Sequence, residues 1–278
     1  MNKISVVLPI LSISPFIVAL TEFCIATLRA HADNPFDLIL VEGGKPNYRD
    51  RDEQQQASVW GVDKYLGFNP KIGGVKEINA GIRAATTEFV LLTGNDVIVP
   101  PHWDTELLRC FEERPDCGLA SLSAFEPGAT IGPDVPQDRI VEGMYSPFNM
   151  FRRQTVGGLG GVAMVRDWEY DEHFVRVYQD SDFVMRFYEA GFRAYRSCRA
   201  HVHHLLRMTT DRMDPVENAK HHAMLRMDEE RFYARWGKSP LAIFGLIRAG
   251  QYTYSREYLS FMQPVGDGSP QHPANRVR

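Results

Sequence analysis

The chain lacks several features that would place it in a familiar class of protein. Its four cysteines, Cys24, Cys110, Cys117 and Cys198, form no C-x-x-C pair, which argues against a cysteine-based structural zinc site. Their irregular scatter fits reduced thiols in a core and predicts a cytoplasmic location. No stretch approaches the roughly 20 apolar residues of a membrane span, so we expect no integral membrane segment. The 31 basic against 35 acidic side chains leave a net charge of −4, without the basic excess of a general nucleic-acid binder.

An apolar stretch at residues 4–20 imitates a signal peptide, with Lys3 as its basic end. Pro9 and Pro15 interrupt it, and no small-residue cleavage site follows cleanly, so we predict that it belongs to the folded domain. A length of 278 residues fits one large α/β domain or two merged halves.

The pattern of apolar residues alternates between strand and helix. Short β-branched runs predict buried strands, and Ser14 followed by Pro15 predicts a helix start, with Phe16, Leu20 and Phe23 at helical spacing. Such alternation implies a mostly parallel sheet covered on both faces, with ligands at the carboxyl ends of its strands. The predicted strands are Ile4–Leu8, Phe36–Val41 and Glu88–Leu92, and the predicted helices after the first are Lys76–Ala85, Trp103–Phe111, Ser181–Ala190 and Asp214–Trp236.

Two stretches have the composition of irregular structure. The segment Phe125–Gly161 is rich in Pro, Gly, Asp and Asn and predicts a long loop region, which in compact domains is usually functional or mobile. Residues 264–278 are rich in Pro and Gly and have no periodicity, so we predict a disordered tail.

The turn Thr93-Gly94-Asn95-Asp96 directly follows the predicted strand Glu88–Leu92. An acidic residue at the carboxyl end of a parallel strand can reach a ligand, and Mg²⁺ or Mn²⁺ takes carboxylate oxygens together with phosphates. Ordinary turn chemistry explains Gly-Asn-Asp equally well.

The run Gln179-Asp180-Ser181-Asp182 stands at a predicted helix start. It reads as an N-cap with favourable first-turn charge. It also reads as a general base, because a carboxylate can take the proton from an attacking hydroxyl.

Two further motifs have a metal or nucleotide interpretation. His201-x-His203-His204 could hold a metal, although the H-E-x-x-H signature of zinc hydrolases is absent. Gly158, Gly160 and Ala163 match a dinucleotide fingerprint variant. We reject a dehydrogenase, because residues 151–156 make a poor buried strand and residues 164–170 a poor helix.

In order along the chain, these motifs resemble those of family 2 glycosyltransferases with the GT-A fold. The resemblance covers about residues 3–237, and its specificity lies in the order and spacing of individually weak motifs. The matching segments are Ile4–Pro9, Leu38–Gly44, Gly73 or Gly74 with Asn79-Ala80-Gly81, Asp96 of a D-x-D motif, Gly160–Arg166 with Asp171–Phe174, Asp180-Ser181-Asp182, Val202-His203-His204 and Arg235-Trp236-Gly237.

The resemblance implies a Rossmann-like nucleotide-sugar half (about 1–115), an acceptor half (about 116–210) and a helical extension at 238–263. The family's reaction is an inverting single displacement from a nucleotide-diphosphate sugar, with Mn²⁺ or Mg²⁺. The implied base is Asp180, with Asp182 as the alternative, and the implied metal ligands are Asp96 and His203. The residues implied to contact the donor are Pro9, Ile10, Glu42, Gly74, Asn79, Asn95 and Asp96.

Three positions depart from the family pattern: Gly94 replaces the first D-x-D carboxylate, Glu42 an aspartate, and Gln179 an acidic residue. Two alternatives remain. A sugar nucleotidyltransferase would want a glycine-rich, basic loop after the first strand, and Pro9–Pro15 holds neither glycine nor lysine. A nucleotide-sugar-binding protein without transferase activity fits the missing carboxylate. The acceptor stays open among a glycan, a lipid-linked sugar, a protein, a small molecule and a modified nucleobase.

Overall fold

The structure is a computed structural model. It describes residues 3–11, 14–44, 52–125, 139–143, 148–153, 169–175, 178–205, 215–239, 242–243 and 245–246. The glycine-rich run at 157–161, the tail at 264–278 and most of the predicted extension at 238–263 lie outside these residues.

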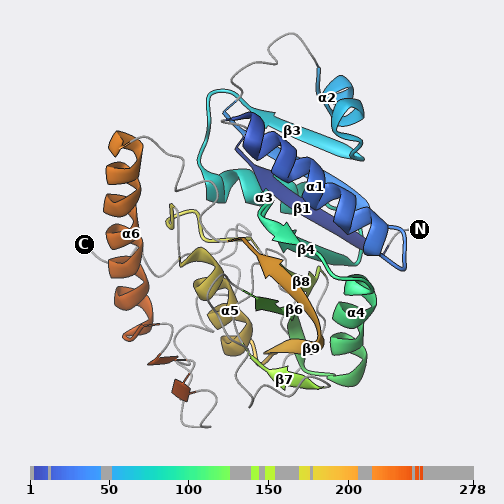
Figure 1. Cartoon of the computed structure of the whole chain (residues 1–278). Helices are drawn as coiled ribbons and strands as arrows, with labels where there is room; N and C mark the ends of the chain where they lie inside the picture. The colour runs from blue at the N-terminus through green and yellow to red at the C-terminus, as the bar shows by residue number, and fades with distance from the viewer. Residues whose placement is uncertain are drawn as a thin grey trace, which may run out of the picture.

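A nine-stranded sheet forms the centre of the molecule (Figure 1). Its strands are β1 (Ile4–Ile10), β2 (Asp37–Gly43), β3 (Lys64–Phe68), β4 (Phe89–Thr93), β5 (Val97–Ile98), β6 (Cys117–Phe125), β7 (Ile140–Glu142), β8 (Phe148–Arg152) and β9 (Arg193–His204). The order is β3-β2-β1-β4-β8-β6-β9-β5, with β7 also paired to β9. Strands β3, β2, β1, β4, β6 and β9 share one direction, whereas β8, β5 and β7 run against it. The predicted, mostly parallel α/β sheet is therefore confirmed.

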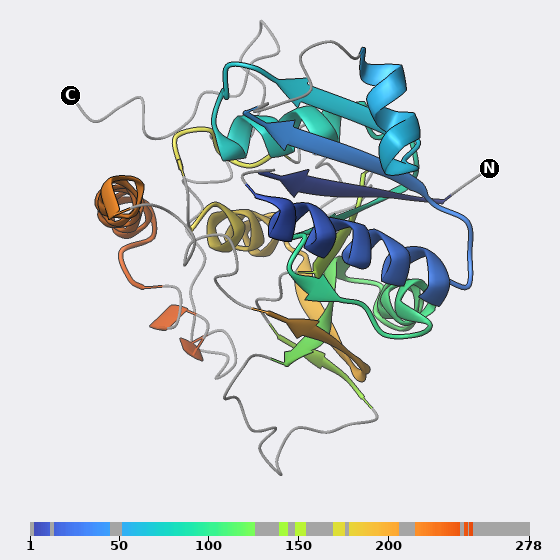
Figure 2. The ribbon, with the colours of Figure 1, turned by 45° about the horizontal axis from the view of Figure 1, so that its top comes forward.

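Helices cover both faces of this sheet. The helices are α1 (Pro15–His31), α2 (Glu53–Trp60), α3 (Gly74–Ala84), α4 (Trp103–Glu113), α5 (Gln179–Glu189) and α6 (Pro215–Trp236). Side chains of α1, α2 and α4 share one apolar core, and those of α3, α5 and α6 share the other. Figure 2, in which α6 is seen nearly end-on, shows this helix outermost, on the side of α5.

Helix α1 begins as predicted, but its buried face differs from the apolar face predicted from Phe16, Leu20 and Phe23. The Ser14 hydroxyl accepts a hydrogen bond from the Ile17 amide at 3.3 Å, and Pro15 occupies the first turn. The buried face starts at Ile17, whereas Phe16 and Phe23 are 44% and 51% exposed. A single sequence cannot choose between two apolar stripes one residue apart.

The predicted loop Phe125–Gly161 is partly wrong. It contains the edge strand β7 and the strand β8, which is inserted antiparallel between β4 and β6. The run 151–156, which we predicted to be a poor strand because it contains Arg152, Arg153 and Gln154, overlaps β8 only at Phe151 and Arg152. The guanidinium of Arg152 stacks over the Phe89 and Phe111 rings and pairs with Glu88, so its charge does not enter the core.

The structure also bears on the cysteines and on the search for a membrane span. All four cysteines are buried and free. Within the described ranges, no helix is both long and apolar enough to cross a membrane.

Candidate functional site

The carboxyl ends of β1, β2 and β4 meet at one edge of the sheet. Pro9 and Ile10 pair with β2 but lie beyond Val7, the last residue of β1 that pairs with β4. The strands β2 and β4, which flank β1, therefore separate at this point. Open α/β sheets bind ligands where the neighbours of a strand separate in this way. Glu42, the last residue but one of β2, pairs with Ile10, and Asp96 follows β4.

The turn that carries Asp96 is held from two sides. The Asn95 amide donates a 2.8 Å hydrogen bond to the Thr21 hydroxyl on α1. The Leu205 amide, at the end of β9, donates to the Asp96 carbonyl at 2.8 Å. Asn95, a predicted donor contact, thus directs its side chain at α1 and positions the turn instead.

The structure brings His204, and not His203, to Asp96. The Nε2 atom of His204 lies 3.6 Å from Oδ2 of Asp96, and both side chains are largely buried. The neighbouring His203 is exposed, and its ring stacks on Phe125 at 5.2 Å between centroids. Adjacent residues of a strand face opposite sides, so only one histidine can face the turn. The candidate metal ligand at this position is therefore His204.

Gly94, the departure from the D-x-D pattern, has a structural explanation. A Cβ atom at this position would lie 2.7 Å from Oδ1 of Asp96, closer than real Cβ atoms approach. The Asp96 carboxylate thus occupies the space into which a first carboxylate would project. The negative charge of Asp96 also acts on Cys24 of α1. Burial is the main cause, and Asp96 the second, that raises the pKa of the Cys24 thiol to about 12.

The residues beside Asp96 fit a divalent cation that is shared with a ligand. Among the described residues, no group of three or more His, Cys, Asp or Glu side chains could hold a metal on its own. Asp96 and His204 offer one carboxylate and one imidazole. That pair suits Mn²⁺ better than Mg²⁺, because Mg²⁺ prefers oxygen ligands only, and diphosphate oxygens would complete the shell.

Glu42 is a buried carboxylate with one oxygen in use. The Tyr65 hydroxyl donates to its Oε2 at 2.6 Å, and Oε1 is buried without a hydrogen-bond partner in the described part of the chain. Burial, followed by the hydrogen bond to Glu42, raises the pKa of Tyr65. Oε1 therefore has acceptor capacity that no described residue uses.

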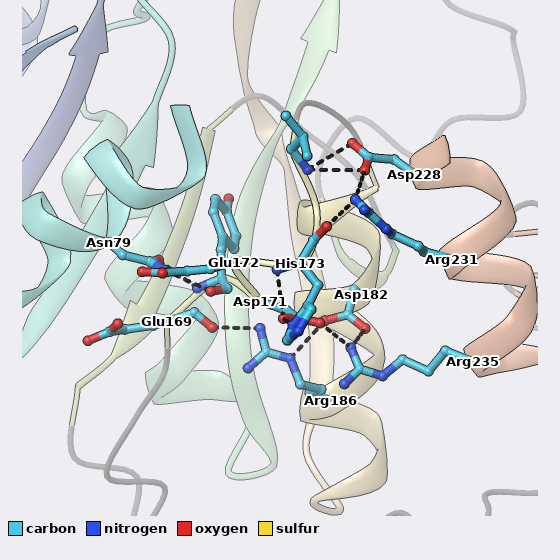
Figure 3. A network of polar contacts seen from close by, with 12 residues as sticks. Asn79, Glu169, Asp171, Glu172, His173, Asp182, Arg186, Asp228, Arg231 and Arg235 are labelled. Atoms are coloured by element: carbon cyan, nitrogen blue, oxygen red, sulfur yellow. Dashed lines mark hydrogen bonds and ion pairs between the residues drawn. The ribbon is translucent and has the colours of Figure 1, made fainter. Parts of the chain in front are cut away.

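The two candidate bases on α5 have different surroundings, and Figure 3 shows those of Asp182. Asp182 is fully buried and accepts hydrogen bonds from Arg186 and Trp236 at 3.0 Å each, and from Arg235 at 2.5 Å. Both of its carboxylate oxygens therefore accept hydrogen bonds from protein side chains.

Asp180 is half-buried, and its one hydrogen-bond partner among the described residues is the Ser181 amide, at 2.8 Å from Oδ1. Burial raises its pKa. A carboxylate with a raised pKa and an unused oxygen suits a general base better than the paired Asp182.

Comparison with known proteins supports the fold. No protein-family model and no curated protein sequence matches the chain. Among solved structures, residues 1–349 of S. aureus TarS match at a TM-score of 0.55 and 14% identity, over 92% of this chain and 77% of that one. A mannosyltransferase from Pyrobaculum calidifontis, in complex with GDP-Man and Mn²⁺, matches at 0.55 and 15%, over 90% and 69%. GalNAc-T7 with UDP, GalNAc and Mn²⁺ matches at 0.57 and 10%, over 75% and 45%.

The chain has the GT-A fold. It spans 43% of the longer TarS structure that it also matches, so the activities of whole relatives do not transfer to it directly.

One predicted donor contact, Asn79, joins two parts of the GT-A scaffold. The Asn79 side chain donates to the Tyr170 carbonyl and accepts from the Tyr170 amide, each at 2.8 Å, which ties α3 to the segment before α5. Gly81 lets α3 approach β1, since a Cβ there would collide with Val7. Gly74 is the first residue of α3, next to the sheet edge.

A clamp between α5, α6 and residues 169–175 had no signal in the sequence (Figure 3). Asp228 accepts two hydrogen bonds from the Val175 amide, at 3.0 and 3.1 Å, and Arg231 donates to the His173 carbonyl. Arg235 joins Asp171 to Asp182. These pairs lie up to 64 residues apart in sequence, so helical spacing alone could not reveal them.

Proposed function

We propose that the chain is a divalent-metal-dependent, inverting glycosyltransferase that moves a sugar from a nucleotide-diphosphate donor to an acceptor hydroxyl. The observation that carries this proposal is the approach of Asp96 and His204, from the ends of β4 and β9, to 3.6 Å at the ligand-binding edge of a GT-A fold. Two solved structures of the same fold are complexes, one of TarS with UDP and one of a mannosyltransferase with GDP-Man and Mn²⁺.

The donor would lie across the edge formed by β1, β2 and β4. The unpartnered oxygen of Glu42 would accept an N–H group of the nucleobase, next to Pro9 and Ile10. Asp96 and His204 would hold the cation, whose charge would stabilise the leaving diphosphate.

Asp180 would accept the proton of the acceptor hydroxyl as that oxygen attacks the anomeric carbon. Its raised pKa improves its match to a proton acceptor working near neutral pH. Asp182 would take no part in the chemistry, since two arginines and a tryptophan hold it.

The remaining assignments are part of the same proposal. The nucleotide-sugar half comprises about residues 1–115 and the acceptor half about 116–210, followed by an extension at 238–263 and a tail at 264–278. The protein would work in the cytoplasm on a glycan, a lipid-linked sugar, a protein, a small molecule or a modified nucleobase.

The test is release of nucleotide from UDP-, GDP- and dTDP-sugars with Mn²⁺, together with thermal shift, in which a donor at 100 times its Kd adds about 2.7 kcal/mol. Asp96→Ala should abolish both release and the Mn²⁺ dependence of donor binding, whereas the distant Glu88→Ala should change neither. Unchanged metal-dependent binding in Asp96→Ala would refute the site.

The same assay separates the alternatives. A protein that only binds nucleotide sugars would show a metal-dependent thermal shift without release of nucleotide under any condition. A sugar nucleotidyltransferase would instead release pyrophosphate from a nucleoside triphosphate and a sugar phosphate.

A further inference from the structure

Three polar side chains on the α5 face of β6 and β9 have no partners in the described part of the chain. The atoms concerned are Oγ of Ser123, Nε of Arg196 and Nε2 of His201, all buried and without a hydrogen bond. Ser123 is only 5% exposed. Buried polar groups are normally hydrogen-bonded, so three such atoms in one place need an explanation.

These three side chains are neighbours. In the β6–β9 pairing Ser121 stands opposite Arg196, and Ser123 stands opposite His201. Ser121 and Ser123 are two residues apart and therefore share a face of the sheet. The positive charge of Arg196 is also, after burial, a cause of the lowered pKa of His201.

The other arginines of β9 show what is unusual about Arg196. Arg193 lies 3.8 Å from a Glu142 oxygen, and Arg199 lies 3.2 Å from a Glu113 oxygen. Arg196, on the same strand, has neither an ion pair nor a hydrogen bond from its side chain to the described residues. Burying part of a guanidinium costs free energy unless an anion pairs with it. The N–H donors of the guanidinium match the oxygens of phosphate and carboxylate groups in a bidentate arrangement.

The position of this cluster separates it from the donor edge. Phe125 pairs with His203, and His204 is the next residue along β9. His204 lies beside Asp96 and faces the side of the strand opposite to the cluster. Helix α5 covers the face of the cluster. A short turn at Gly191 joins α5 to β9, so the helix runs back along the strands and its first turn, with Asp180, lies towards their carboxyl ends (Figure 1).

We propose that Arg196, Ser123 and His201 bind an anionic group, a phosphate or a carboxylate, carried by the acceptor. The guanidinium supplies charge and paired N–H donors, and the hydroxyl and the imidazole add further donors. That the anion belongs to the acceptor rests on the proposed function. The anion site itself does not, because it requires only the three side chains.

The experiment is a calorimetric titration of inorganic phosphate, and separately of acetate, into the full chain in EDTA, so that no cation bridges phosphate to the donor edge. Arg196→Gln should weaken anion binding about tenfold or more, as expected for loss of a charge-assisted hydrogen bond. Arg199→Gln, the matched control on the same strand, should bind as the wild type does. Ser123→Ala should show a smaller loss, and the tighter of the two anions identifies the acceptor group.

Equal weakening by Arg196→Gln and Arg199→Gln would overturn the site, as would the absence of saturable binding of either anion to the wild type. Loss of anion binding in Asp96→Ala, but not in Arg196→Gln, would place the anion at the donor edge and also overturn it. Failure of the transferase proposal leaves these titrations unaffected, since they involve no donor and no turnover.

Discussion

Two sets of acidic side chains, one in the clamp between α5 and α6 and one in the candidate site, differ in what surrounds them. In the clamp to α6, Asp182 and Asp228 are fully buried, and arginine, tryptophan or backbone N–H groups engage their carboxylates. In the candidate site, Oε1 of Glu42 has no hydrogen-bond partner among the described residues, Asp180 accepts a hydrogen bond from the Ser181 amide, and His204 lies 3.6 Å from Asp96, beyond hydrogen-bond distance.

Burial does not separate the two sets, whereas hydrogen bonding to protein side chains does. Glu42 and Asp182 are equally buried, at 0% exposure each. A buried carboxylate that is fully paired stabilises the fold it sits in, and removing it leaves its partners unsatisfied. A carboxylate with an unused oxygen is available to a substrate or a cation. The following substitutions test this division.

The largest effect is expected at Asp180. Asparagine keeps the shape of the side chain but cannot accept a proton, so Asp180→Asn should lower kcat by a factor of about 10²–10⁴ with donor affinity nearly intact. The wild-type rate should fall as pH falls, because the protonated acid is no base. Since burial raises the pKa of Asp180, this fall should lie above the range of an exposed aspartate. A folded Asp180→Asn enzyme with near-normal kcat would remove the assignment.

The second effect is on stability. Asp182→Ala removes the ion-pair partner of the buried Arg186 and one of the two carboxylates that pair with Arg235, and it should lower the free energy of unfolding by about 3–5 kcal/mol. Glu88→Ala is the control, because Glu88 forms an exposed ion pair with Arg152 that should contribute about 0–1 kcal/mol. Denaturant unfolding measures both. A stable Asp182→Ala protein that has lost only activity would transfer the catalytic role from Asp180.

The third effect separates two adjacent histidines. His204→Ala should raise the Mn²⁺ concentration needed for half-maximal donor binding by about tenfold or more. His203→Ala should leave it unchanged, because that ring stacks on Phe125 away from Asp96. Metal titrations of the two variants give the answer, and the reverse order would restore His203 as the ligand.

The smallest effect is expected at Glu42. Glutamine can still accept a hydrogen bond, so Glu42→Gln should weaken donor binding only about fivefold, the difference of about 1 kcal/mol between a charged and a neutral acceptor. Tyr65→Phe is the control, since it removes the hydroxyl from Oε2 but leaves the carboxylate. If both variants bind donor as the wild type does, the nucleobase lies elsewhere.

The sequence correctly predicted those parts of the fold that depend on residues close together in the chain. The N-cap at Ser14, the apolar repeat of Trp103, Leu107 and Phe111, and the helix stop at Gly237 each depend on neighbours within a few residues, and the structure has them all. Strand β8 was missed for the opposite reason. Its pairing to β4 joins segments about 60 residues apart, and its arginine looked incompatible with a core strand until two aromatic rings covered it.

The same distinction applies to the candidate site. The sequence by itself determined that Asp96 follows a strand, that Asp180 and Asp182 open a helix, and that two adjacent histidines cannot both face the turn, because caps and side-chain alternation are local properties. The residue predicted from the sequence to face it was His203. Only the tertiary structure decided which histidine it is, since the register of β9 contains an irregularity before His201 that sets the facing of everything after it. It also decided between the two aspartates, because the arginines that engage Asp182 lie on α5 and α6, and only packing brings them to one carboxylate.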